Sequence, residues 1–238
     1  LEDLATTTSR PLAELDREWL DGSTVRTRDG FVVTGDGTRV VVVSECVSYT
    51  QTPCAATVRR VIDMRGDALV APTRWTDPLV GPGSIVAATT EDGAVFLDAA
   101  GATHSAAGHT PVAVMSEHVL TTRDGALFAH LGDAPPTQLA TSYRMLTIDP
   151  AGRSAAFLDD TSTLVIWADQ QLVHTDATVD RIMFVHGGAT LAVSASSTLV
   201  ITAAGALATT FETDCVRNAK GIGEDLFFEL CSAPNDEL

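Results

Sequence analysis

The sequence predicts an all-β protein assembled from a repeated unit, and three observations support this prediction. A short apolar pattern recurs several times along the 238-residue chain. Its apolar runs are short and rich in Val, Ile, Thr, Leu and Phe, as is typical of strands. Turn-forming Asp-Gly, Gly-Asp-Gly and Ala-Gly steps separate the runs. After residue 20 no run shows the three-and-four spacing of an amphipathic helix, so the repeated unit is expected to be made of strands.

The repeat is visible when the chain is compared with itself. The two most similar copies are STLVIWADQQ (162–171) and SSTLVITAAG (196–205). More diverged copies are RDGALFAHLGD (123–133), EDGAVFLDAAG (91–101) and ATVRRVIDMRG (56–66). One equivalent apolar position runs through all five: Val58, Val95, Leu127, Val165 and Val200. These positions are 37, 32, 38 and 35 residues apart, a period that indicates either a helical solenoid or a β-propeller.

The pattern within each unit favours the propeller, because each unit divides into up to four strands. In the clearest unit the expected strands are residues 143–149, 154–159, 163–168 and 171–175. The next unit gives 181–187, 190–195, 198–203 and 206–211, and the preceding one gives 111–116, 118–123, 126–131 and 137–141. Four antiparallel strands repeated about every 35 residues predict propeller blades, with the first strand of each lining a central channel.

Residues 1–238 are expected to form a single β-propeller of six four-stranded blades, with seven blades as the alternative. Residues 216–232 supply two further strands without a following pair. We expect residues 1–15 to complete this last blade, so that the N- and C-terminal strands close the ring and leave no exposed sheet edge. Residues 16–30 are expected to form a linker, a short helix and turn, into the first blade.

The segment IDPAGRSAAFLDDTSTLVIWA (148–168) resembles a blade of TolB-like and WD-repeat-like bacterial propellers. In those families a Pro-Asp-Gly turn joins the inner strand to an Ala-Phe strand, whereas the order here is Asp149-Pro150-Ala151-Gly152. We take the Trp-Asp ending and the Gly-His start of true WD repeats to be absent, and Trp167-Ala168-Asp169 is only a near match to that ending. The resemblance implies the propeller fold for about residues 31–230 and carries over no functional residue.

The composition limits the classes of partner. The chain has 31 acidic and 15 basic residues, for a net charge of −16. This charge argues against nucleic acid, whose phosphates require concentrated positive charge, and against anionic lipid. Fourteen of the fifteen bases are arginine, which indicates a GC-rich bacterial genome. No apolar run approaches the roughly 20 residues of a transmembrane helix, and from the start at Leu1 we expect that a signal peptide or membrane anchor has been lost.

The four cysteines form two local pairs in sequence. Cys46 and Cys54 are eight residues apart, and Cys215 and Cys231 are sixteen apart. Neither spacing is that of a zinc site. We expect two disulfides, with buried free thiols as the alternative, and therefore an extracytoplasmic protein, either secreted or anchored to the outer face of the cell membrane.

The sequence indicates no catalytic residue, metal site or cofactor. Most acidic candidates lie beside glycine or in pairs between strands, where turn formation explains them; they are Asp63, Asp92, Asp98, Asp124, Asp149, Asp159 and Asp160. His104 and His109 are expected to be solvent-facing loop residues, and His186 is a candidate to face the channel. His118 and His130 lie on or beside strands, where exposure or a hydrogen bond explains them. Gly-x-Ser-x-Gly, Ser-x-x-Lys and phosphate-binding-loop motifs do not occur.

The least repeat-like segments are the best candidates for interaction, because propeller loops vary freely on a rigid scaffold. Residues 44–60 carry Tyr49, Arg59 and Arg60, and residues 73–83 carry Arg74 and Trp75. Tyr, Trp and Arg are enriched in interface hot spots. We therefore predict a non-catalytic binding or scaffold module of the cell envelope that holds a protein or small ligand at a propeller face. The alternatives are a hydrolase or lyase acting on a polysaccharide or cell-wall fragment, and a metal or small-ligand binder using the channel.

Overall fold

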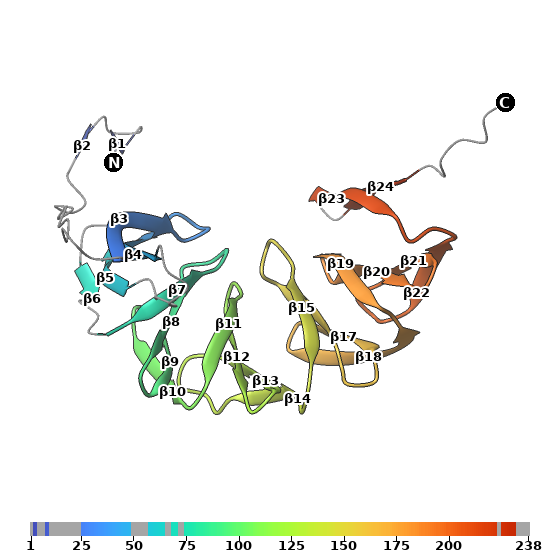
Figure 1. Ribbon diagram of the computed structural model, residues 1–238, viewed down its shortest axis with the longest axis horizontal. Helices are drawn as coiled ribbons and strands as arrows, with labels where there is room; N and C mark the ends of the chain where they lie inside the picture. The colour runs from blue at the N-terminus through green and yellow to red at the C-terminus, as the bar shows by residue number, and fades with distance from the viewer. Residues whose placement is uncertain are drawn as a thin grey trace.

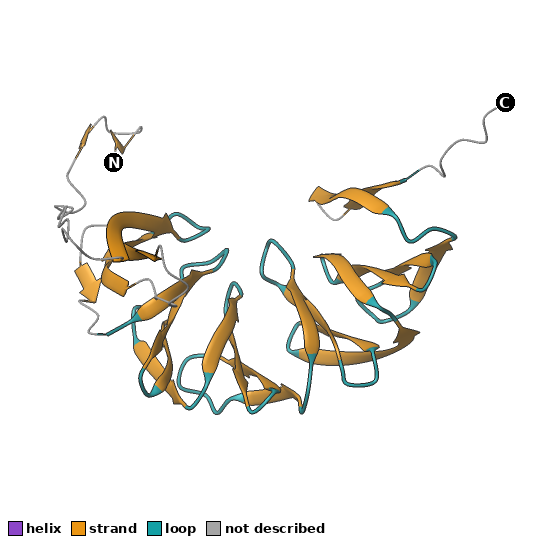
Figure 2. Ribbon diagram, in the orientation of Figure 1, coloured by secondary structure: helices purple, strands orange, loops and turns teal. Residues whose placement is uncertain are grey.

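The computed structural model describes residues 2–3, 8–9, 25–48, 57–64, 68–70, 74–222 and 225–231. Over these residues the chain consists of strands and the turns between them, without a helix (Figure 2). It follows that the described segments include no helix of a length and apolarity suited to crossing a bilayer. The all-β prediction is confirmed.

Over the described residues five consecutive groups of four strands follow one another, and we number them blades one to five; blades three to five are separate antiparallel sheets, whereas blades one and two are joined in one eight-stranded sheet. Blade one contains β3 (Val25–Val33), β4 (Arg39–Ser48), β5 (Thr57–Asp63) and β6 (Ala68–Val70). Blade two contains β7 (Thr76–Val80), β8 (Val86–Thr90), β9 (Gly93–Leu97) and β10 (Thr103–Ala107). Blade three contains β11 (Thr110–Val114), β12 (Val119–Arg123), β13 (Ala126–His130) and β14 (Thr137–Ala140). A single strand pairing, Thr57 with Thr76, also joins blades one and two.

Blade four contains β15 (Arg144–Ile148), β16 (Ser154–Leu158), β17 (Thr163–Ala168) and β18 (Gln171–Thr178). Blade five contains β19 (Arg181–His186), β20 (Ala189–Ser194), β21 (Ser197–Ile201) and β22 (Leu207–Phe211). They are followed by the hairpin of β23 (Val216–Ile222) and β24 (Asp225–Leu230), as expected for the two additional strands. The repeat register is also confirmed: the five equivalent apolar positions all lie in third strands, namely Val58 in β5, Val95 in β9, Leu127 in β13, Val165 in β17 and Val200 in β21.

The blades follow one another around an arc, with β7, β11, β15 and β19 on its inner side and the fourth strands on its outer side (Figure 1). The arc is open between blade one and the β23–β24 hairpin. Near the N-terminus β1 (Glu2–Asp3) pairs only with β2 (Thr8–Ser9). The number of blades and the closure of the ring by residues 1–15 therefore stay predictions. Residues 25–30 of the expected linker belong to β3, and the rest of the linker lies outside the described residues.

The core fills the spaces between neighbouring blades, and blade four shows how. Successive side chains of a strand point to opposite faces, so β16 and β17 supply two different clusters. Phe157 and Trp167 face blade three, where they pack with Leu127. Leu158 and Ile166 face blade five and join its cluster. Each middle strand is therefore apolar on both faces, which explains why its sequence reads as an unbroken apolar run.

The first strands of blades two to five each contain one irregularity. The strand register shifts between Thr76 and Leu79, Pro111 and Ala113, Arg144 and Leu146, and Ile182 and Phe184. A bulge of this kind bends a strand and increases its local twist. Because it recurs at the same place in four blades, it belongs to the repeated unit, although no feature of the sequence pattern predicts it.

Turns between the first and second strands link successive blades at one end of the propeller. We call residues 34–38, 81–85, 115–118, 149–153 and 187–188 the turn belt. The amide of Gly35 donates to the carbonyl of Gly81 at 2.8 Å, and the amide of Ser116 donates to the carbonyl of Gly152 at 3.0 Å. Gly152 has φ +67°, and a Cβ there would lie 2.4 Å from Cγ of Pro82 and 2.6 Å from the amide nitrogen of Ser116. Only glycine fits this approach.

The belt continues past blade four. The buried carboxylate of Asp149 accepts hydrogen bonds from its own turn, at Ala151, and from the amide of Gly187 in blade five, at 3.3 Å. The ring of His186 then lies against Gly221 of β23, where a Cβ would overlap the imidazole. Each blade is thus tied to the next by its first turn, which fixes the position of this end of every blade relative to its neighbours.

Arg39 joins blades one and two inside the structure. It is almost completely buried, and its guanidinium donates to the carbonyl oxygens of Ser84 (2.6 Å), Asp98 (2.5 Å) and Ala99 (3.1 Å). Buried charges of this kind are tolerated only when they are hydrogen-bonded. The side chain therefore secures two turns of blade two to the first blade.

A disulfide closes the final hairpin. Cys215 and Cys231 flank β23 and β24, are bonded, and have their Cα atoms 5.3 Å apart. This confirms one of the two expected disulfides. Cys46 lies in β4, but its side chain and the whole of Cys54 are outside the described residues, so the second disulfide stays a prediction.

Candidate binding surface

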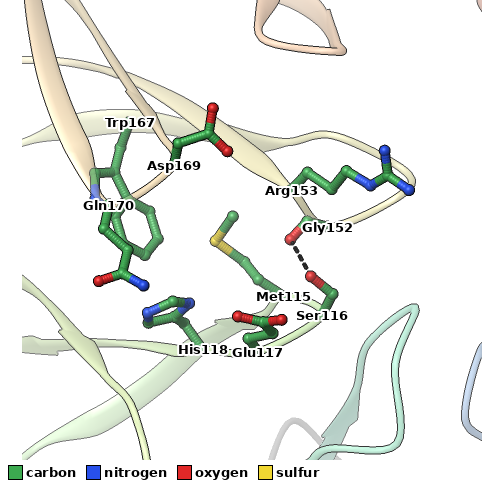
Figure 3. A pocket seen from close by; sticks show the side chains of 9 residues that line it. All are labelled: Met115, Ser116, Glu117, His118, Gly152, Arg153, Trp167, Asp169 and Gln170. Carbon is green, nitrogen blue, oxygen red and sulfur yellow. Dashed lines mark hydrogen bonds between the residues drawn. The ribbon is translucent and has the colours of Figure 1, made fainter.

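The turn belt lies on one end of the propeller, which we call the belt face, and a pocket of about 410 Å³ opens there between blades three and four. The turn after β11, the turn after β15 and the β17–β18 turn all contribute to it. Its lining residues are Met115, Ser116, Glu117, His118, Gly152, Arg153, Trp167, Asp169 and Gln170 (Figure 3). They come from two blades, so the pocket exists only because the blades are held side by side.

The inner part of the pocket is apolar and aromatic. Trp167, one residue before the end of β17, has 4% of its surface exposed, and Met115 is likewise buried. The His118 ring meets Trp167 edge to face, with ring centroids 4.9 Å apart and planes at 80°. Burial lowers the pKa of His118, although the charge of Glu117 opposes this shift. His118 is therefore neutral at pH 7, and its ring forms part of the aromatic wall of the pocket.

Charged side chains surround the mouth. Glu117, Arg153, Asp169 and Gln170 are exposed, and Asp169 and Gln170 form a tight two-residue turn with φ of +49° and +60°. The hydroxyl of Ser116 donates to the carbonyl of Gly152 at 3.0 Å and adds a second bond to the belt contact beneath the mouth. The pocket is thus lined by groups whose backbone positions are fixed by the fold.

Two histidines in blade three are buried, which corrects the expectation that His109 is a solvent-facing loop residue. His109 precedes β11 and His130 ends β13; Nδ1 of His109 and Nε2 of His130 are each 2.8 Å from Oγ1 of Thr121. Burial, and then the nearby Arg123, lowers the pKa of His109. Burial and the second histidine lower the pKa of His130 to about 4. A Gly-His step does occur in the sequence, at Gly108-His109, where none was expected.

His104 is also buried, in β10, and the expectation of a loop position is wrong for it too. Its two ring nitrogens contact carboxylates of Asp98 and Asp133, each at 2.8 Å. The hydrogen bond to Asp98 raises the pKa of His104, and that to Asp133 adds to it, against partial burial. The imidazolium therefore clamps the outer strand of blade two to the turn after β13.

Several candidate carboxylates act as turn residues, as the sequence analysis proposed. Asp159 accepts hydrogen bonds from the amides of Thr161 and Thr163 at 2.9 Å, and Asp149 holds the belt turn described above. His186 lies at the end of β19, with its Nδ1 3.6 Å from Asp149. Over the described residues no set of three or more His, Cys, Asp or Glu side chains has the arrangement of a metal site.

The expected interaction residues are not gathered in one place. Tyr49 lies outside the described residues. Arg59 and Arg60 are exposed on β5, and Arg74 is exposed and pairs with Glu91 at 3.1 Å, beside a second pocket at the opposite end of blade two. Trp75 is 5% exposed and packs in the core of blades one and two. The structure gives its ring a packing role, and its expected contact with a partner stays untested.

The inner wall of the arc is apolar where three blades meet. A pocket of about 480 Å³ is formed by first strands and the segment before β15, and its lining residues are Leu79, Val80, Val112, Ala113, Val114, Tyr143, Leu146 and Ile148. None of these side chains is an acid or a histidine. The belt-face pocket, in contrast, combines aromatic and charged groups, and it was missed in the sequence because its residues belong to two separate repeats. The only available signal was that Glu117-His118 and Gly152-Arg153 occupy equivalent turns of neighbouring units.

No family model and no curated protein matches this sequence. Among solved structures it is similar in fold to WD40 and other β-propeller proteins. Hsv2 of Kluyveromyces lactis matches with TM-score 0.44 and 7% identity, over 81% of this chain and 68% of that one. AztD of Citrobacter koseri matches with TM-score 0.46 and 14% identity, over 78% and 60%. The WD40 domain of SCAP from fission yeast gives 0.46 and 10%, over 84% and 57%. The chain thus spans about two thirds or less of the length of these three structures.

Proposed function

We propose that this chain is a non-catalytic binding module that holds a protein partner on its belt face. The observation that carries the proposal is the pocket between blades three and four, where Trp167, Met115 and His118 form the wall and charged side chains form the mouth. Trp, Met and Arg are enriched at the centres of protein interfaces, and an aromatic pocket surrounded by polar groups is the usual arrangement of a hot spot.

The scaffold supports this function, because belt hydrogen bonds join two of the three turns that form the pocket, the turn after β11 and the turn after β15. Preorganised groups lose less conformational freedom on binding, so more of the contact energy contributes to affinity. The alternative of a glycoside hydrolase in the channel requires two converging carboxylates. The described inner-wall pocket is apolar instead, which favours binding over catalysis.

Site-specific photo-crosslinking tests the proposal. A photoreactive amino acid that replaces Arg153, on the belt face, should form a discrete crosslinked product with a partner protein when the variant is produced in the native host and irradiated in intact cells. The matched control places the same residue at Asp160, which is exposed in the β16–β17 turn at the opposite end of blade four. Equal adducts at both positions, or none at either, would refute a belt-face binding function.

We also propose that the ring has six blades and that residues 1–15 complete the blade begun by β23 and β24. Both ends of the arc expose apolar side chains that a neighbouring blade would cover, Phe31 on β3 (60% exposed) and Phe227 on β24 (47%). Deleting residues 1–15 should lower the midpoint of thermal unfolding and speed amide exchange in β23 and β24. Unchanged exchange would favour seven blades or an open ring.

An extracytoplasmic location completes the proposal. The Cys215–Cys231 disulfide supports it, because disulfides persist mainly in oxidising compartments. Non-reducing peptide mapping of protein taken from its native host should find both this bond and Cys46–Cys54. Four free thiols in that sample would contradict the assignment of the compartment.

A further inference from the structure

The mouth of the belt-face pocket carries a net negative charge. Its charged side chains are two carboxylates, Glu117 and Asp169, and one guanidinium, Arg153, and the neighbouring His118 is neutral. No ion pair joins these charges to one another or to other described residues. In Figure 3 the guanidinium of Arg153 extends away from Met115 and Trp167. The part of the mouth nearest the aromatic wall is therefore the most acidic.

Below this acidic mouth the wall changes to apolar and aromatic groups. Met115 contributes a polarisable thioether, and Trp167 and His118 contribute ring surface. A ligand group that satisfies both regions has an apolar stem and a cationic end. Arginine and lysine side chains have this form, since their methylene stems pack on apolar surface while the charged group stays at a polar boundary. Aromatic faces also attract such cations.

The charge of the whole chain favours the same class of partner. With a net charge of −16, the protein attracts basic segments over long distances and repels acidic ones. A small cation would be attracted as well, but it would leave the apolar wall uncovered. A side chain presented by a polypeptide uses both features.

We propose that the belt-face pocket binds one arginine or lysine side chain presented by a basic segment of a partner protein. The inference rests on the proposed binding function and adds the chemical class of the partner. Glu117 and Asp169 supply the charge recognition, and Trp167 and Met115 supply the surface for the stem.

Peptides capped at both ends test this directly: acetyl-Gly-Arg-Gly-amide, its Lys counterpart, and a Gln counterpart as the neutral control. The readout is the indole N–H resonance of Trp167 in the ¹⁵N-labelled protein, assigned with Trp167→Phe. The Arg and Lys peptides should shift it saturably, with dissociation constants on the order of 1 mM for a single side chain. The Gln peptide should shift it far less, and 0.5 M salt should weaken binding of the cationic peptides.

The double variant Glu117→Gln/Asp169→Asn should bind the Arg peptide about three- to tenfold more weakly, as expected for two exposed charge pairs. The control Asp160→Asn removes one exposed charge elsewhere on blade four and should keep wild-type affinity. Equal shifts with the Gln and Arg peptides, or wild-type affinity in the double variant, would overturn the inference. If the crosslink at position 153 still forms in that case, the belt face binds a protein but not through an arginine or lysine side chain. If neither the crosslink nor the peptide binding is observed, the proposed binding function is refuted as well.

Discussion

The buried pair of histidines in blade three makes the stability of the protein depend on pH, and His130→Gln is the variant that exposes this dependence. Thr121 has one hydroxyl proton, which it can donate to only one of the two rings. The chain of hydrogen bonds is therefore complete when one ring donates to Thr121 and the other accepts from it. A glutamine at position 130 keeps a side-chain amide near the place of Nε2, yet it cannot take up a proton.

The size of the pH-dependent change in the free energy of unfolding follows from the pKa of His130. Its value is about 4 in the folded protein, against 6.5 for an ordinary histidine. Because the folded pKa is depressed, the unfolded chain binds a proton first as the pH falls. The stability is fully present above pH 6.5 and is lost toward pH 4. Linkage gives a loss of about 2 kcal/mol by pH 5 and about 3 kcal/mol by pH 4.

Urea unfolding of the wild type and of His130→Gln at pH 7.5 and pH 5 measures this loss. We expect the wild type to lose about 2 kcal/mol more than the variant over this interval. His109, whose pKa is also lowered, contributes in the same direction in both proteins. His104, whose pKa is raised, contributes stability below pH 6.5 that is lost as the pH rises, again in both proteins. The difference between the two proteins therefore isolates His130.

The matched control is His174→Gln, which removes an exposed histidine from β18 and leaves the contacts of Thr121 with His109 and His130 intact. Identical losses in the wild type and in His130→Gln would refute the reasoning. An NMR titration that places the pKa of His130 near 6.5 would do the same without any variant.

Three further substitutions test the links between and within blades. Replacing Cys215 and Cys231 by serine should destabilise the β23–β24 hairpin by about 3 kcal/mol, measured as faster amide exchange there than in blade four. Gly152→Ala should lower the free energy of unfolding in urea by about 2–3 kcal/mol, because the added Cβ would overlap the backbone of the turn belt. Gly125 also has a positive φ, +82°, but open space around it, so Gly125→Ala should lower the free energy of unfolding by only about 1 kcal/mol. Arg39→Met should lower the free energy of unfolding by about 3 kcal/mol, because three partly buried carbonyls lose their donor, and a wild-type unfolding midpoint would contradict that role.

Strands were predictable because their signal is local. In blade four the expected ranges 154–159 and 163–168 match β16 and β17 to within one residue, since apolar runs and Asp or Gly turns are written directly in the sequence. The linker and the closing blade were less predictable, because they depend on how distant parts of the chain meet. The expected end of the linker, residues 25–30, is instead strand, paired along its length with β4.

The belt-face pocket could not be predicted from the sequence, because it too depends on how distant parts of the chain meet. Trp167 and His118 are 49 positions apart in the sequence, and each alone is explained by its own strand. His109 and His130 appeared to be ordinary polar residues because no local pattern shows that both rings meet Thr121.

The turn belt also determines how local unfolding spreads from one blade to the next. Each described blade is tied by its first turn to its neighbours, and Gly152 of blade four also approaches Pro82 of blade two, so the belt couples the described blades mainly from one neighbour to the next. In the described arc, blade one and the β23–β24 hairpin have one described neighbour each, so deleting residues 1–15, which we propose to close the ring, should make unfolding begin there. Blades three and four are the units farthest from both ends, so the segments that line the belt-face pocket belong to the last part of the chain to lose its structure.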